Sequence, residues 1–123
     1  MIRMIKVPAD ENIDLTEVEL PGGYPDMNEA MDFRLIERVS TGRKLPDGSD
    51  LVFIVDEEGM LIPLPYNVRA SYFYPGSIYG DAYFCAEVWV DDPEEGRMRD
   101  FANLPENFGT SDLQNLALTM EPN

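Results

Sequence analysis

Two short segments of the chain carry clustered carboxylates. Asp56, Glu57 and Glu58 form the first, and the second runs over 91–95. Clustered carboxylate oxygens bind hard cations such as Mg²⁺ and Ca²⁺, and two carboxylates in different surroundings act as general acid and base. Neither segment has the spaced ligands of an EF-hand loop, and acidic side chains beside glycine or proline are typical of solvated turns. We therefore expect no metal and no cofactor, and 56–58 is kept as a candidate binding segment.

Histidine is absent, and cysteine occurs once, as Cys85 in the apolar run 83–86. Nucleophile systems of the Ser–His and Cys–His type, and nearly all zinc sites, depend on imidazole. The glycines form neither the dinucleotide-binding spacing nor a Walker loop. A lone cysteine in an apolar run forms no internal disulfide and is typical of a buried, inert thiol. No catalytic residue is predicted, and we expect that the protein is not an enzyme.

Two further groups of residues are candidates for binding. Asn67, Arg69 and Tyr72 would line a small-ligand pocket in which aromatic walls and a few polar groups fix orientation. Asn67 would equally bond its own backbone in a turn. Glu87 and Trp89 lie two residues apart, so they share one face of a strand. An exposed tryptophan beside a carboxylate is a candidate for a protein interface.

The charge of the chain limits its partners. It has 24 acidic and nine basic residues, a formal net charge of -15. Such a charge repels nucleic acid and anionic membranes and favours cationic partners. We therefore expect no direct nucleic-acid contact and no membrane contact. Solubility, or life in a salty cytoplasm, is an equally good reason for the charge.

The length of 123 residues and a hydrophobic share of 44% suit one folded domain over 1–123. Strands are predicted at 1–7, 16–20, 51–55, 60–64 and 82–90, and helices at 26–33 and 112–120. The continuous apolar run 51–55 is typical of a strand buried on both faces. With 60–64 it would form a hairpin whose tip projects residues 56–58 into water.

Together these elements predict a small α+β domain, with a mainly antiparallel sheet and a central hairpin packed by one or two short helices. Its core covers about 1–90, and 91–123 is a C-terminal extension. The run 34–39 either prolongs the first helix or begins a strand, and its periodicity does not decide. The segment 97–108 is expected to be loosely structured. No signal peptide or membrane-spanning run is visible, so we expect a soluble, cytoplasmic protein. The oligomeric state stays open, a homo-oligomer included.

Three short pieces of the sequence resemble a known family. They are Asp-Glu-Glu-Gly at 56–59, Leu-Pro-Tyr-Asn at 64–67 and Ile-Tyr-Gly-Asp at 78–81. In this order they resemble a small domain of unknown function found in phage and plasmid proteins, over roughly residues 1–90. The resemblance implies a phage or mobile-element accessory protein in the cytoplasm of a host cell, and it implies no activity.

These observations favour a noncatalytic binding protein. We expect it to bind a host or phage protein, one that itself binds nucleic acid included, through an acidic surface flanked by aromatic residues. Imitation of DNA, which carries one phosphate charge per roughly 1.7 Å of duplex, is one version of this function. The alternative is a small-ligand or nucleotide-binding sensor that uses the Tyr66–Asp81 region.

Overall fold

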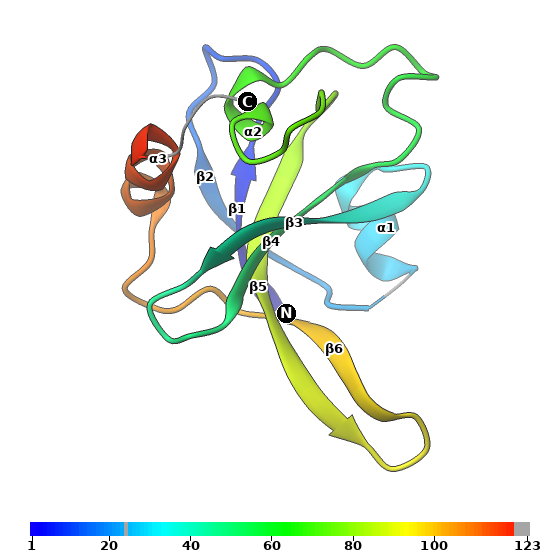
Figure 1. The fold of residues 1–123 in the computed structure, drawn as a ribbon. Coiled ribbons are helices and arrows are strands. Elements are labelled where there is room, and N and C mark those ends of the chain that lie inside the picture. The colour runs from blue at the N-terminus through cyan, green and yellow to red at the C-terminus, as the bar shows by residue number, and fades with distance from the viewer. Residues whose placement is uncertain (24, 120–123) are drawn as a thin grey trace.

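Antiparallel strand pairing organises the molecule (Figure 1). The structure is a computed structural model that describes residues 1–23 and 25–119. Six strands form one sheet in the order β2-β1-β5-β4-β3, and β6 pairs with β5. The elements are β1 (Ile2–Val7), β2 (Thr16–Leu20), α1 (Asp26–Met31), β3 (Ile36–Lys44), β4 (Asp50–Asp56), α2 (Val68–Ser71), β5 (Ala82–Asp92), β6 (Gly96–Ala102) and α3 (Thr110–Thr119). The predicted α+β class with a mainly antiparallel sheet is confirmed.

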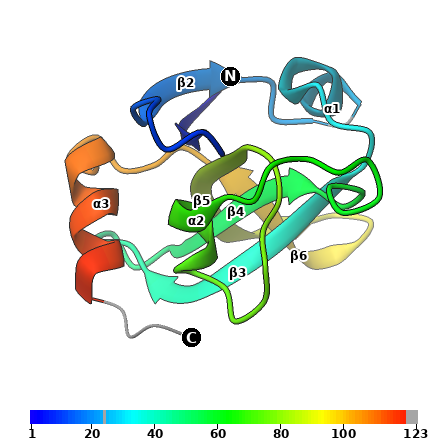
Figure 2. The ribbon, with the colours of Figure 1, turned by 90° about the horizontal axis from the view of Figure 1, so that it is seen from above.

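The central strand β4 is buried on both faces, as the run 51–55 predicts. Phe53 belongs to an apolar cluster on one face, which includes Leu113 of α3. Ile54 belongs to a second cluster on the opposite face, which includes Met27 of α1. Figures 1 and 2 show α1 and α3 on opposite sides of the sheet. Burial of each large apolar side chain stabilises the fold by about 1.5–3 kcal/mol, so these two faces supply most of the core.

Helix α1 is shorter than the predicted helix over 26–33. It ends at Met31 because Asp32 adopts the left-handed conformation, with a φ of 57°. In that conformation the N–H of Asp32 donates to the carbonyl of Glu29 at 3.1 Å, which satisfies an end carbonyl of the helix. The helix has Pro25 at its N-cap and no side-chain cap.

Pairing with β4 decides that the ambiguous run 34–39 contributes to a strand. β3 pairs with β4 along its whole length, with one bulge. The bulge falls where Gly42 takes a φ of 71°, a conformation that favours glycine. β3 continues to Lys44, so only 45–49 connect the two strands. A tertiary partner thus settles a choice that local periodicity leaves open.

The predicted hairpin between 51–55 and 60–64 is wrong. β4 is already hydrogen-bonded to β3 on one edge and to β5 on the other, so no edge is left for a returning strand. The chain turns instead: the N–H of Gly59 donates to the carbonyl of Asp56 at 3.1 Å, and the N–H of Leu64 donates to the carbonyl of Gly59 at 2.9 Å. β4 therefore forms its hairpin with the strand before it.

β5 and β6 form a hairpin that projects from the body of the molecule (Figure 1). β5 pairs with β1 as far as Phe84 and with β4 as far as Glu87, and beyond that it pairs with β6 alone. We call residues 88–100 the arm. The prediction that 97–108 is loosely structured is wrong over β6, because pairing with β5 orders a segment with no apolar pattern of its own.

The tip of the arm is an acidic turn. The carboxylate of Asp92 accepts hydrogen bonds from the backbone N–H groups of Glu94 at 2.8 Å and Glu95 at 2.9 Å. Both bonds lower the pKa of Asp92, and the bond from Glu95 has the larger effect. Gly96 closes the turn with a φ of 77°, a conformation that favours glycine.

Helix α3 closes one face of the sheet. It covers the predicted helix 112–120 except for residue 120, which lies outside the described residues. Before the helix the N–H of Gly109 donates to the carboxylate of Asp112 at 2.8 Å. Leu113 then packs into the core beside Phe108. Among the described residues, no helix is long and apolar enough to cross a membrane.

The buried position of Cys85 on β5 predicts an unreactive thiol. Cys85 is fully buried, and this burial, with a smaller contribution from Glu87, raises the pKa of the thiol to about 12. Because the thiolate is the nucleophile, iodoacetamide at pH 8 should modify the native protein at least about a hundredfold more slowly than the urea-unfolded chain. Mass spectrometry of timed samples measures both rates. Similar rates would show that β5 is accessible in the native state.

Candidate functional site

The structure separates the eight predicted binding residues into three places. Residues of the 56–58 segment lie at the end of β4 and in the turn after it, those of the 67–72 segment lie on α2 and at its two ends, and the last two lie on β5. The residues concerned are Asp56, Glu57, Glu58, Asn67, Arg69, Tyr72, Glu87 and Trp89. These residues therefore do not form one site.

Asp56 does not project into water as predicted. Its buried carboxylate accepts hydrogen bonds from the backbone N–H groups of Arg34 at 2.8 Å, Leu35 at 3.4 Å and Glu58 at 3.0 Å. It thus fixes the end of β4 to the segment that leads into β3. Only Glu57 is exposed as predicted, and Glu58 is half-buried.

Asn67 is also a structural residue. It is fully buried, and its side-chain amide donates to the carbonyls of Val7 and Gly80, each at 2.9 Å. Its side-chain oxygen accepts from the N–H of Ala70 at 3.0 Å, which caps α2. These bonds use the whole amide group, so Asn67 holds α2 on β1 and offers nothing to a ligand.

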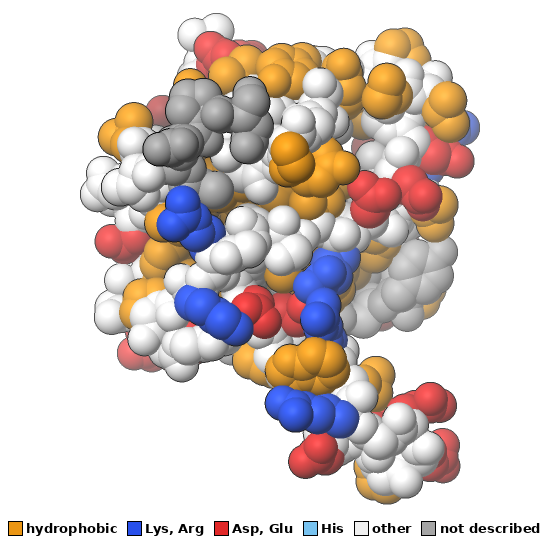
Figure 3. Space-filling model, in the orientation of Figure 1, with side chains coloured by type: hydrophobic (Ala, Val, Ile, Leu, Met, Phe, Trp, Pro, Cys, Tyr) orange, Lys and Arg blue, Asp and Glu red, His pale blue; other side chains and the backbone are white. Residues whose placement is uncertain are grey.

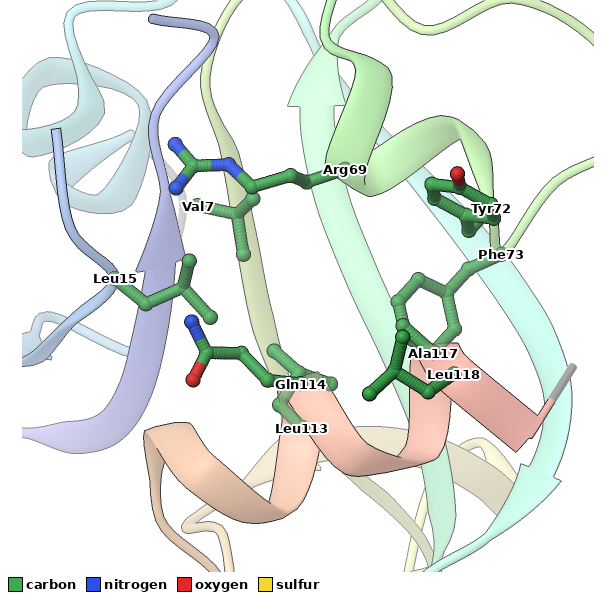
Figure 4. Close-up of a pocket in the computed structure, with 9 residues that line it drawn as sticks. All are labelled: Val7, Leu15, Arg69, Tyr72, Phe73, Leu113, Gln114, Ala117 and Leu118. Carbon is green, nitrogen blue, oxygen red and sulfur yellow. The ribbon is translucent and has the colours of Figure 1, made fainter. Parts of the chain in front are cut away.

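Arg69 and Tyr72, in contrast, both line a cavity (Figure 4). Arg69 lines it from α2 and Tyr72 from the end of that helix, opposite residues of α3. One terminal nitrogen of Arg69, Nη2, donates to the backbone carbonyls of Pro8 at 2.6 Å and Asp10 at 2.9 Å. The prediction of a pocket near these residues therefore named two of the lining side chains, but the α3 half of the wall could not be foreseen without the tertiary contact.

Glu87 forms a buried ion pair at the base of the arm. Its carboxylate accepts hydrogen bonds from Nε of Arg38 at 2.5 Å and from Nη2 of Arg38 at 2.6 Å. Nη1 of Arg99 lies 3.7 Å from the same carboxylate. The hydrogen bond to Glu87 raises the pKa of Arg38 against the opposing effect of burial. A bidentate pair fixes both side chains in one geometry, so β3, β5 and β6 are joined at this point.

Trp89 lies next along the arm between two arginines. The guanidinium carbons of Arg97 and Arg99 lie 4.9 Å and 4.8 Å from the centre of the Trp89 ring, within cation–π distance. Even so, 48% of Trp89 stays exposed. Across the β5–β6 ladder, Arg99 is paired with Trp89 and Arg97 with Asp91. Arg97 and Arg99 are two residues apart, so they share the face of the hairpin that carries Trp89, and this spacing was the sequence signal for the group. That signal becomes readable only when β6 is known to be a strand.

Basic side chains concentrate on the strands around this group. Of the nine basic residues, three lie on β3 and two on β6. Figure 3 shows Lys and Arg side chains over this side of the molecule and at the projecting arm, with hydrophobic side chains between them. The acidic protein therefore presents a localised basic and aromatic surface, which we call the arm surface and which consists of Arg38, Glu87, Trp89, Arg97 and Arg99.

The acidic segments do not converge on a metal-ligand group. Within residues 1–23 and 25–119, no three Asp, Glu or Cys side chains lie together in a way that could hold a metal ion. Arg34 lies 3.8 Å from Glu58, and Lys44 lies 2.6 Å from Asp50. Several carboxylates thus pair with cations of the same chain.

Two known proteins that are similar to parts of this chain are RNA-modifying enzymes. The chain is 36% identical over 52 residues to a probable tRNA pseudouridine synthase D from Picrophilus torridus, and this match covers 42% of the chain and 13% of that protein. The fold of the present chain is similar to part of a crystal structure of the small RNA methyltransferase HEN1, with a TM-score of 0.59 and a sequence identity of 15%. The similar region covers 86% of this chain and 15% of the methyltransferase chain. At such identity the likeness shows a shared fold alone. No family model matches the chain.

These comparisons contradict the prediction that the protein is not an enzyme, because both matched proteins are enzymes that modify RNA. The prediction depended on the absence of histidine and of known catalytic motifs. That absence excludes imidazole chemistry only, since carboxylate, lysine and tyrosine side chains also act as general acids and bases. The chain spans a small part of each matched protein, and the resemblance to a phage and plasmid domain stays a prediction.

Loss of the Asp56 carboxylate should destabilise the protein. Asp56→Ala leaves three backbone N–H groups without their acceptor, so the free energy of unfolding should fall by roughly 2–4 kcal/mol. Glu57→Ala removes the exposed neighbouring carboxylate and should change it by less than about 0.5 kcal/mol. Urea unfolding followed by circular dichroism measures both. Equal effects of the two substitutions would contradict the structural role of Asp56.

Asn67→Ala tests the attachment of α2. It leaves two buried carbonyls and one N–H unsatisfied, so we expect a loss of roughly 2–4 kcal/mol in the free energy of unfolding. Hydrogen exchange should also quicken at Ala70, whose N–H loses its cap. The exposed Asn107→Ala is the matched control and should behave like the wild type. An unchanged exchange rate at Ala70 would exclude the capping role.

Proposed function

We propose that the chain is a protein-binding module of RNA-modifying machinery, and that it docks on its partner through the arm surface. The observation that carries the proposal is the half-exposed Trp89 held between Arg97 and Arg99 on a projecting hairpin. Tryptophan and arginine are the residues most enriched among those that dominate binding energy at protein interfaces. Their position on a projection lets them reach into a partner.

The arm is poorly supported by its own chain. Beyond Glu87 it consists of two strands, and within the described part of the chain no third strand pairs with them; an isolated two-stranded hairpin is marginally stable in water. Trp89 and Met98 are exposed on it, and no described strand pairs with the outer edge of β6. Apolar side chains and an open strand edge on a projection are features that a bound partner covers.

The charges of the arm specify the surface that would receive it. Arg97 and Arg99 require carboxylates or carbonyls of the partner, Trp89 requires an apolar pocket, and the acidic tip around Asp92 requires a basic group. This alternation supports a folded protein as partner. Extended RNA is disfavoured, because the net charge of -15 repels a polyanion.

The link to RNA modification is supported by the two matched proteins. Each is an RNA-modifying enzyme by its name, and in each the region like this chain is a small part of a longer chain. A small fold that forms part of a longer enzyme, as in the methyltransferase structure, is typical of a module joined to other parts. A phage or mobile-element origin, proposed from the three motifs of the sequence, is compatible with this role, because such proteins also act on the machinery of their host.

Capture of the partner tests the proposal. The tagged protein, its Trp89→Ala variant and its Tyr66→Ala variant are used to capture partners from lysate of the source cell. Tyr66 is 47% exposed on another part of the surface, so it is the matched aromatic control. We expect one protein, recovered with wild type and Tyr66→Ala, whose measured affinity falls at least about tenfold with Trp89→Ala. Removal of Arg97 and Arg99 should weaken binding and reduce its dependence on salt.

Two results would overturn the proposal. The first is a partner that binds all three proteins with equal affinity, because the arm would then not be in the interface. The second is tight binding of a single-stranded RNA oligonucleotide that quenches Trp89 fluorescence, with no protein partner. That result would assign the arm surface to base stacking.

A further inference from the structure

A cavity lies between the sheet and the two helices on its α3 side (Figure 4). Val7 of β1 and Leu15 contribute one wall, Arg69 of α2 and Phe73 of the segment after α2 contribute a second, and α3 contributes the remaining wall. Its volume is about 230 Å³. Sites for drug-sized ligands enclose about 300–1,000 Å³, so this cavity suits a smaller molecule.

The lining of the cavity is almost wholly apolar. The α3 wall consists of Leu113, Ala117 and Leu118, with Gln114 beside them. Leu118 is 84% exposed and Tyr72 is 43% exposed, so the cavity opens to solvent between apolar side chains. An apolar cavity with an apolar rim favours an occupant with an apolar body, because water in it finds few hydrogen-bond partners.

Arg69 is the one charged group in this lining. Its Nη2 is held by the carbonyls of Pro8 and Asp10, which places the side chain across the cavity wall. Its Nε is buried and has no hydrogen-bond partner among the described residues. No carboxylate of the described residues forms an ion pair with it, although 24 acidic residues are present in the chain.

The guanidinium of Arg69 therefore lacks an anionic acceptor among the described residues. The two carbonyls accept hydrogen bonds from Nη2 but do not neutralise the positive charge, and the buried Nε is left without an acceptor in the described part of the chain, which destabilises the folded protein. A carboxylate matches a guanidinium in geometry and charge. Gln114 offers a second polar group in the lining.

We propose that this cavity binds a small monocarboxylic acid with an apolar body, with the carboxylate on Arg69 and the body against Phe73, Leu113 and Ala117. The two parts of the lining specify the two parts of the ligand. A neutral apolar molecule leaves Arg69 unsatisfied, and a dianion or a nucleotide brings more charge than one cation and an apolar wall accept. The cavity lies on the body of the protein, so this binding is independent of the arm surface.

The choice between an acid and an alcohol of equal chain length tests the proposal. Octanoate and octanol are titrated into the full-length protein by calorimetry, and ¹⁵N NMR locates the residues that respond. We expect octanoate to bind at least about tenfold more tightly than octanol, with shifts at Val7, Leu15, α2 and α3. Arg69→Met should bring the ratio of the two affinities close to one, and Ala117→Phe, which fills the cavity, should abolish binding of both.

Arg43→Met is the matched control, since it removes an exposed arginine of β3 outside the cavity and should leave the ratio unchanged. If Arg69→Met does not fold, Arg69→Lys keeps a cation and should keep a reduced preference for the acid. Equal affinities of octanoate and octanol for the wild type would overturn the proposal. So would the absence of saturable octanoate binding, or shifts confined to residues outside the cavity.

Discussion

The pairing of β5 on both of its edges is the constraint on which the rest of the structure depends. On one edge β5 pairs with β4, and on the other it pairs first with β1 and then with β6. This arrangement buries the centre of the sheet on both faces and leaves the far end of β5 with one neighbour. The core and the arm therefore both result from the length of β5, because its first half lies in the sheet and its second half extends beyond β1 and β4.

The two candidate sites use opposite physical means. The arm surface places an aromatic ring and cations on a projection, where they are exposed to a macromolecule. The cavity has one cation, Arg69, in an otherwise apolar lining between β1, α2 and α3, and its size admits only a small molecule. Neither site involves the acidic turn after β4, because Asp56 is used to bind backbone N–H groups.

The charged residues of the protein are distributed unevenly, which the net charge of -15 does not show. Basic residues are few, and five of the nine lie on β3 and β6. Arg38 pairs with the buried Glu87, so this part of the charge holds strands together. Arg97 and Arg99 stack on Trp89 and stay at the surface. A description by net charge alone therefore misses the one region where cations gather.

The sequence by itself determined the class of fold, because the short continuous apolar run 51–55 and the β-branched or alternating segments 1–7, 16–20 and 82–90 favour strands. It also indicated two short helices and the residues Arg69 and Trp89. Only the tertiary structure decided that 36–44 and 96–102 are strands, since pairing with β4 and β5 overrides a weak local preference. It likewise joined α3 to Arg69 and β6 to Trp89, because residues far apart in sequence meet only after the sheet has formed.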